Sequence, residues 1–221
     1  DWLNPEDVME LHKILEVANN APVKSALLFL DRRFVDVKIR KYAVECLEAA
    51  DDQEIQLFML QLVQQLRFER YTDSYLARLL LRRSLSNKQV VGHAFFWGLQ
   101  AEKHVPQCSR KFLALLDLFV KFCGDHKIAI GHQMFLMNKL VAVSNRVLEG
   151  QTKGERNEIL LNELKTLILP PTFQLPINPY LIFSSIQAEK CRVMNSKKKP
   201  LFMCFTVSHK LDKFGNATEI T

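Results

Sequence analysis

Glycine and proline are scarce in this sequence, with 7 and 8 residues among 221. Sheet-rich domains with many turns need more of both, so this scarcity favours long helices over a loop-rich β-sandwich. Long apolar runs are also missing, because charged or amide residues interrupt every hydrophobic stretch before the ~20 residues that a membrane-spanning helix needs. We therefore expect a mainly helical protein of one large or two small domains that meets a membrane only from outside.

The five cysteines form no C-x-x-C pair, and their odd number does not suit a secreted disulfide framework. The opening residues, "DWLNPEDVMEL", lack the basic and apolar regions of a signal peptide. We expect a cytoplasmic protein with reduced thiols.

The net charge indicates anionic partners but does not show which kind. The net charge of +6 and the pI of about 9.1 favour encounters with anionic nucleotides, phospholipids or acidic proteins. Nucleic acid is not an expected partner, because no nucleic-acid motif is present and the basic residues are not interleaved with stacking aromatics. The stripe formed by Arg78, Arg82 and Arg83 either touches acidic lipid, an acidic partner or a neighbouring domain, or forms a solvated helix face with ion pairs. The solvated face is favoured.

From about residue 4 to residue 169 the hydrophobic period is helical and predicts roughly nine helices. The segment "DQEIQLFMLQLVQQLRF" places Ile55, Met59 and Leu62 on one face, as in a helix that packs on one side. A weak internal repeat relates "DVKIRKYAVECL" to "DSYLARLLLRRS", whose first residues, Asp36 and Asp73, are expected N-caps. The repeat favours antiparallel helix pairs stacked as in a HEAT or armadillo solenoid.

After Leu169 the sequence changes character. Four prolines fall between residues 170 and 179, which cannot continue a helix and predict an extended linker. Apolar and aromatic segments then flank "NSKKKP", a pattern of strand, tight loop and strand. We expect a helical domain over residues 1–173 and a second region over residues 174–221. The last residues read as a strand that is only beginning, so we expect the chain to be a fragment.

The loop in "CRVMNSKKKPLFMCF" has two readings. Its serine and lysines could cap nucleotide phosphates, with N–H groups and the hydroxyl donating and the ammonium groups offsetting charge. The loop contains no glycine, however, and lysines commonly keep the edge of a sheet soluble. Composition alone favours the edge reading.

A family resemblance changes that balance. The blocks "LVQQLRFE", "DSYLARLLLRR" and "GHAFFW" follow one another within residues 39–102, as in the helical (PIK) domain of phosphoinositide 3-kinases. The later stretch "EKCRVMNSKKKPLF" resembles the glycine-free phosphate loop at the start of that family's kinase N-lobe, in a form closer to class I enzymes. The resemblance covers nearly the whole chain. It implies a mainly α fold, a helix-pair solenoid followed by the first β-strands of a kinase N-lobe.

The resemblance also implies roles for individual residues of the loop, residues 194–200, and the strand after it. Ser196 would donate to a nucleotide phosphate, and Lys197 and Lys198 would contribute phosphate contacts. Met194 would line the adenine side of the cleft. Phe202 stands where most class I members have tryptophan, so one wall of the pocket would keep its aromatic surface but lose the indole N–H.

For the intact parent, the resemblance implies a kinase that transfers the γ-phosphate of ATP, with magnesium, to the 3-hydroxyl of phosphatidylinositol lipids. The implied partners are the lipid at a membrane surface, to which the protein is recruited peripherally, a regulatory adaptor subunit and other domains of the same kinase. We find no catalytic or metal-binding motif within residues 1–221 and expect this chain alone to be inactive. The alternative is a non-catalytic HEAT-like protein-interaction module.

Two further groups of residues contain side chains that could bind a metal or take part in acid–base chemistry. His104, Cys108, Cys123 and His126 offer zinc-binding atoms, but their spacing matches no common site and an amphipathic helix separates the two halves. We expect helix-end packing for them and no metal. His93, among aromatics in "VGHAFFW", is expected in the core and not in acid–base chemistry.

Overall fold

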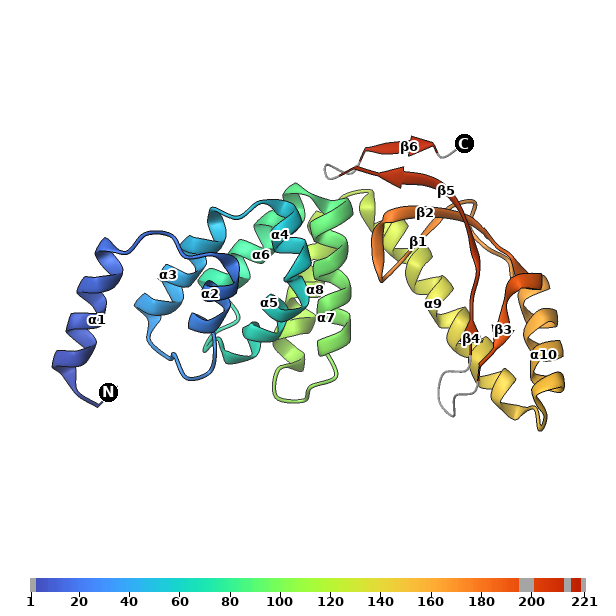
Figure 1. Ribbon diagram of the computed structural model, residues 1–221, viewed down its shortest axis with the longest axis horizontal. Coiled ribbons are helices and arrows are strands. Elements are labelled where there is room, and N and C mark those ends of the chain that lie inside the picture. The colour runs from blue at the N-terminus through green and yellow to red at the C-terminus, as the bar shows by residue number, and fades with distance from the viewer. Residues whose placement is uncertain (1–2, 195–200, 213–215, 220–221) are drawn as a thin grey trace. The chain divides into compact units, whose positions relative to one another are not determined.

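The computed structural model describes residues 3–194, 201–212 and 216–219 (Figure 1). The chain divides into two compact units, Asp1–Gly124 and Asp125–Thr221. The change from helix to strand near residue 173 therefore falls inside the second unit, and the domain boundary expected near residue 174 stays a prediction. The assignment of residues 174–221 to a kinase lobe stays a prediction.

The first unit consists of helices. The α-helices are α1 (Pro5–Val17), α2 (Val23–Phe29), α3 (Val37–Glu48), α4 (Asp52–Leu57), α5 (Met59–Gln65), α6 (Tyr75–Ser86), α7 (His93–Glu102) and α8 (Ser109–Phe122). A 3₁₀ turn, η1 (Leu66–Phe68), follows α5, and a π-helical turn, η2 (Lys88–Gly92), leads into α7.

These helices stack in two layers, as a helix-pair solenoid requires (Figure 1). One layer runs through α3, α6 and α8, and the other through α2, α5 and α7, with α2 packed on α3 and α7 packed on α8. Each helix presents an apolar face to its neighbours, and the largest fully buried side chains include Phe95, Phe112 and Phe119. His93 is 1% exposed, in keeping with the expected place in the core.

Local side chains fix where the repeated helices begin. Asp36 is the N-cap of α3, as predicted, and accepts hydrogen bonds from the N–H groups of Lys38 at 2.8 Å and Ile39 at 3.1 Å. The same prediction for Asp73 is wrong. Ser74 caps α6, and Asp73 instead accepts two hydrogen bonds of 2.6 Å from Arg78. The N-cap of a helix is the last residue with extended backbone before the helix begins, and here that residue is Ser74 and not Asp73.

The segment 52–68 forms two helices and not one. Phe58 has φ −97° and ψ 7°, which ends α4 and starts α5 at the next residue. The predicted apolar face survives the break, because Ile55 before it and Met59 and Leu62 after it are all buried. Periodicity indicated the buried face correctly but could not show this local change of backbone.

A buried ion pair ties the layers of the first unit together. The side chains of Arg40 and Glu69 are 8% and 10% exposed and meet at 2.6 Å. The Arg40 guanidinium also donates to the carbonyls of Leu30 and Phe34, at 2.9 and 3.2 Å. Lys111 of α8 donates to the Glu69 carbonyl at 2.5 Å, and burial lowers the pKa of that ammonium group. Charges at this depth are tolerated because each has several partners.

The arginine stripe of α6 is occupied by contacts within the chain. Arg78 pairs with Asp73, Arg82 with Glu48, and Arg83 with Asp52 at 3.0 Å. Arg83 also donates to the Ala50 carbonyl at 2.6 Å. The stripe is thus a helix face with ion pairs, which is the favoured interpretation of the sequence pattern.

The second unit combines two helices with strands. Its elements are α9 (His126–Glu149), α10 (Lys153–Lys165), β1 (Phe173–Leu175), β2 (Asn178–Ile186), the 3₁₀ turn η3 (Ala188–Lys190), β3 (Arg192–Val193), β4 (Leu201–Phe202), β5 (Phe205–Leu211) and β6 (Ala217–Glu219). An antiparallel sheet has the order β1-β2-β5-β6, and β3 pairs with β4 in a separate hairpin.

The four-stranded sheet packs on α9 through aromatic side chains. Phe173 of β1 and Phe183 of β2 are 3% and 6% exposed and form one buried cluster with Leu136 of α9. Phe205 of β5 adds a third ring, 5.3 Å from that of Phe183. The β2–β5 register shifts on both sides of Phe183, as at β-bulges, which bend a strand over its support.

The fold class is as predicted, a mainly α-helical solenoid followed by strands. Among the described residues, no helix is both long and apolar enough to span a bilayer.

Candidate functional site

The β3–β4 hairpin carries the predicted nucleotide-binding residues. Its two strands are only two residues long and pair Arg192 with Phe202 and Val193 with Leu201. Two residue pairs do not hold a hairpin in water, so the hairpin needs support from elsewhere. That support comes from its inward face.

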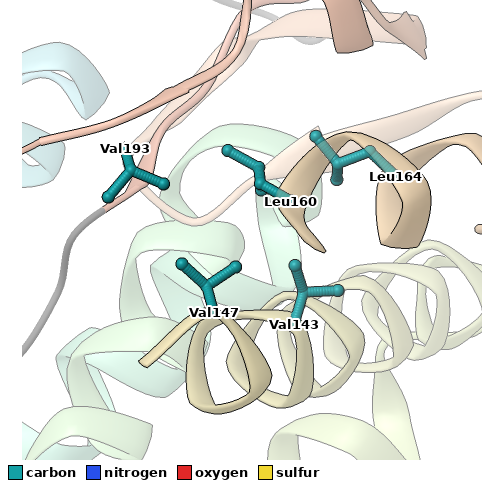
Figure 2. Close-up of a cluster of buried hydrophobic side chains, with 5 residues drawn as sticks. All are labelled: Val143, Val147, Leu160, Leu164 and Val193. Atoms are coloured by element: carbon teal, nitrogen blue, oxygen red, sulfur yellow. The ribbon is translucent and has the colours of Figure 1, made fainter. Parts of the chain in front are cut away.

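Val193 inserts into the core formed by α9 and α10 (Figure 2). It is 3% exposed and packs in one cluster with Val143 and Val147 of α9 and Leu160 and Leu164 of α10. Burying a side chain of this size contributes about 1.5–3 kcal/mol. The hairpin is therefore fixed to the helix pair through Val193, and Leu201 of β4 packs against the same cluster.

The backbone of Val193 is also held by α10. Its N–H donates to Oδ1 of Asn157 at 2.8 Å. A side-chain amide thus satisfies a strand N–H that faces a helix, where none of the described strands lies to accept it. This role of Asn157 could not be predicted from the sequence, because the contact joins residues 36 positions apart.

The opposite face of the hairpin is exposed. The Arg192 guanidinium carbon lies 4.8 Å from the centre of the Phe202 ring, a cation–π contact between paired residues. Phe202 is 37% exposed and Met194, just after β3, is 54% exposed. Both predicted pocket residues are thus available to a ligand. Arg192 was missed, because its place over the ring follows from strand register, which the sequence does not show.

Ser196, Lys197 and Lys198 lie outside the described residues, as does the rest of residues 195–200. Their predicted contacts with phosphate stay predictions. Within the described part, the hairpin supplies a cation and an aromatic ring on one exposed face, which suits a ligand that has both negative charge and a flat apolar surface.

Two thiols flank the base of the hairpin. Sγ of Cys191, the residue before β3, accepts a hydrogen bond from the N–H of Cys204 at 3.3 Å. The Cys204 carbonyl accepts a hydrogen bond of 2.9 Å from the N–H of Gln187. Burial raises the pKa of the Cys191 thiol.

The residues considered for zinc do not meet. Cys108 and Cys123 lie at opposite ends of α8, whose 14 residues span about 21 Å. The described residues contain no group of three His, Cys, Asp or Glu side chains that could hold a metal ion.

Comparison with known proteins gives consistent matches. A family model described as "Phosphoinositide 3-kinase family, accessory domain (PIK domain)" matches residues 1–130. The chain is 34% identical over 206 residues to "Phosphatidylinositol 3-kinase 2" of Dictyostelium discoideum, an alignment that covers 93% of this chain and 11% of that protein. It is 33% identical over 205 residues to "Phosphatidylinositol 3-kinase 1" of the same organism, covering 93% of this chain and 13% of that protein. The chain thus spans little more than a tenth of the length of these relatives.

Proposed function

Because the chain belongs to the phosphoinositide 3-kinase family, we propose that it is part of an ATP-dependent kinase that phosphorylates the 3-hydroxyl of phosphatidylinositol lipids. Residues 1–130 would be the accessory domain of that kinase, and the β3–β4 hairpin would cover the nucleotide. The observation that carries the second assignment is the anchoring of Val193 in the α9–α10 core, which leaves Arg192 and Phe202 on an exposed face.

In this proposal the hairpin binds and orients the nucleotide. The Ser196 hydroxyl and nearby N–H groups would donate to phosphate oxygens, while Lys197 and Lys198 would offset the phosphate charge. Phe202 would offer an aromatic wall, and Met194 a flexible apolar contact to the base. Arg192 would compete with the base for one face of the Phe202 ring.

Magnesium would neutralise charge on the phosphates during transfer. The described residues contain no group of three side chains able to hold it, so no residue in that part of the chain is assigned to the metal. The contribution proposed for this chain is binding and positioning, without a catalytic residue.

The first unit would serve as a scaffold for the rest of the kinase. Its layers are joined by the buried Arg40–Glu69 pair and by Lys111, which makes it suited to present fixed surfaces to other domains and to a regulatory adaptor. The lipid substrate would be met at a membrane surface, to which the protein is recruited from the cytoplasm.

The proposal is tested by nucleotide binding and lipid phosphorylation in the full-length protein. Wild type is compared with the double variant Ser196→Ala/Lys197→Ala. The matched control is Lys24→Ala/Ser25→Ala, which removes the same two side-chain types from neighbouring positions of α2. We expect magnesium-dependent ATP binding in wild type and control, and at least about tenfold weaker binding in the Ser196/Lys197 variant, equivalent to about 1.4 kcal/mol.

The other outcomes distinguish the alternatives. Tight ATP binding that is unchanged in the Ser196/Lys197 variant would mean that these lysines keep the edge of a sheet soluble and do not bind phosphate. Absence of both ATP binding and lipid phosphorylation in the wild type would overturn the kinase proposal and favour a non-catalytic HEAT-like interaction module.

A further inference from the structure

The base of the β3–β4 hairpin brings two cysteines into contact that lie 13 positions apart. Cys191 immediately precedes β3, and Cys204 follows β4 by two residues. Sγ of Cys191 lies 3.3 Å from the backbone nitrogen of Cys204 and 3.9 Å from its carbonyl oxygen. Sγ of Cys204 in turn lies 3.7 Å from the carbonyl oxygen of Lys190, the neighbour of Cys191.

These contacts place the two residues within reach of a disulfide. A backbone N–Cα bond is about 1.46 Å long, so Cα of Cys204 lies no more than about 4.8 Å from Sγ of Cys191. Disulfide-bonded cysteines have Cα atoms about 4.4–6.8 Å apart, a range that this approach allows. The disulfide would form by rotation of the two side chains about χ1, which directs one sulfur at the other.

We propose that Cys191 and Cys204 are a redox-modification site, at which a peroxide converts the two thiols into a reversible disulfide across the base of the hairpin. The inference rests on the contacts of these two residues and is independent of nucleotide binding. Such transient bonds are the usual form of disulfide in a reducing compartment.

The reaction balances with hydrogen peroxide as the oxidant. The Cys204 thiolate attacks one peroxide oxygen, the O–O bond breaks, and a sulfenic acid forms with release of hydroxide, which takes up a proton. The Cys191 thiol then attacks the sulfenic sulfur and gives up its proton, the S–S bond forms, the S–O bond breaks, and the hydroxide that leaves takes up the proton. Two thiols and one peroxide thus give one disulfide and two waters, with two electrons passing from sulfur to oxygen.

The surroundings of the two sulfurs decide this order. The contact of Cys204 Sγ with Lys190 lies at the exposed surface, whereas the contacts of Cys191 Sγ are part-buried. Peroxide therefore meets Cys204 first. Burial raises the pKa of the Cys191 thiol, which keeps it protonated and slow toward free peroxide but leaves it placed to attack a neighbouring sulfenic acid.

The bond would close a covalent loop over residues 191–204. That loop contains both strands of the hairpin and the segment predicted to contact phosphate. The hairpin, which has only two residue pairs of its own, would gain a covalent link close to its attachment to α10, because Cys191 packs against the same cluster as Val193.

Peptide mass measurement tests the site directly. The reduced full-length protein is treated with hydrogen peroxide, remaining thiols are blocked with N-ethylmaleimide, and the protein is cut after glutamate. Cleavage after Glu189 and Glu219 releases residues 190–219 as one peptide that contains only these two cysteines. We expect this peptide to be lighter by two hydrogen atoms and to carry no maleimide, and dithiothreitol to restore labelling of both thiols.

Variants assign the two roles. Cys191→Ser should lose the disulfide and leave a sulfenic acid on Cys204 that dimedone traps. Cys204→Ser should lose both products, while Cys108→Ser, at a half-buried thiol in the first unit, should retain the 191–204 bond. Full maleimide labelling of the peptide after peroxide, or a disulfide from either residue to a different cysteine, would overturn the proposal.

Discussion

At the scale of single residues, the Arg40–Glu69 pair shows how much the first unit depends on one internal contact. Glu69 offsets a guanidinium that is almost wholly buried and that also serves two backbone carbonyls. A buried pair is weak evidence of net stabilisation, since removing two charges from water is costly. Loss of one partner has a much larger effect, because the other charge then stays buried and uncompensated.

We therefore expect Glu69→Ala to lower the free energy of unfolding by about 3–5 kcal/mol. The measurement is urea denaturation followed by circular dichroism. Lys41→Ala, next to Arg40 in α3, provides the control, because the Lys41–Glu45 pair is more than half exposed and should be worth no more than about 0.5 kcal/mol. Equal effects of the two variants would contradict the central role given to the Arg40–Glu69 pair.

At the scale of elements, glycine decides whether the π-helical turn η2 can lie against α8. A Cβ atom on Gly92 would come within 2.7 Å of Cζ of Phe119 and within 2.7 Å of the Ser84 carbonyl oxygen. The carbonyl cannot move without disturbing the end of α6. By contrast, a Cβ on Gly131 of α9 would meet nothing within 4 Å.

Replacing glycine by alanine should thus change the free energy of unfolding in opposite directions at these two positions. Gly92→Ala is expected to reduce the free energy of unfolding by about 1–3 kcal/mol through overpacking. Gly131→Ala is expected to raise it by about 0.4–1 kcal/mol, because alanine restricts the unfolded chain and favours helix. Thermal unfolding of both variants checks the pair, and a stabilising Gly92→Ala would show that η2 is free to move off α8.

The sequence predicts elements better than the contacts between them. The apolar periodicity indicated the buried faces of the helices, and the Asp36 cap followed from its residue type alone. The break at Phe58 and the cap at Ser74 were missed, since each depends on one backbone conformation that several residues can adopt. At the candidate site, Phe202 came from a resemblance, whereas Arg192 and Asn157 act through strand register and tertiary packing, which period and composition do not encode.

At the scale of the whole molecule, the first unit has its own core and its own ion network. All eight of its α-helices lie within Asp1–Gly124, and the buried pair that links its layers lies there too. A unit with its own core and its own buried ion pair should not need the strands of the second unit to fold.

Residues 1–124 expressed alone are therefore expected to be folded. The helical signal in circular dichroism should be lost in one cooperative urea transition, and Glu69→Ala should move the midpoint of that transition to lower urea. A broad, non-cooperative loss of signal would instead mean that the first unit depends on residues after Gly124.

Because β3 is attached to α10, the hairpin and that helix should move together. Val193 is held by the apolar cluster around its side chain and by the hydrogen bond from its backbone N–H to Asn157. Arg192 and Phe202 lie on the exposed face of the hairpin. A slide or tilt of α10 is then transmitted through Val193 to Arg192, its neighbour in β3, and to Phe202, which pairs with Arg192. The position of the exposed Phe202 ring is in this way set by how β3 is attached to α10.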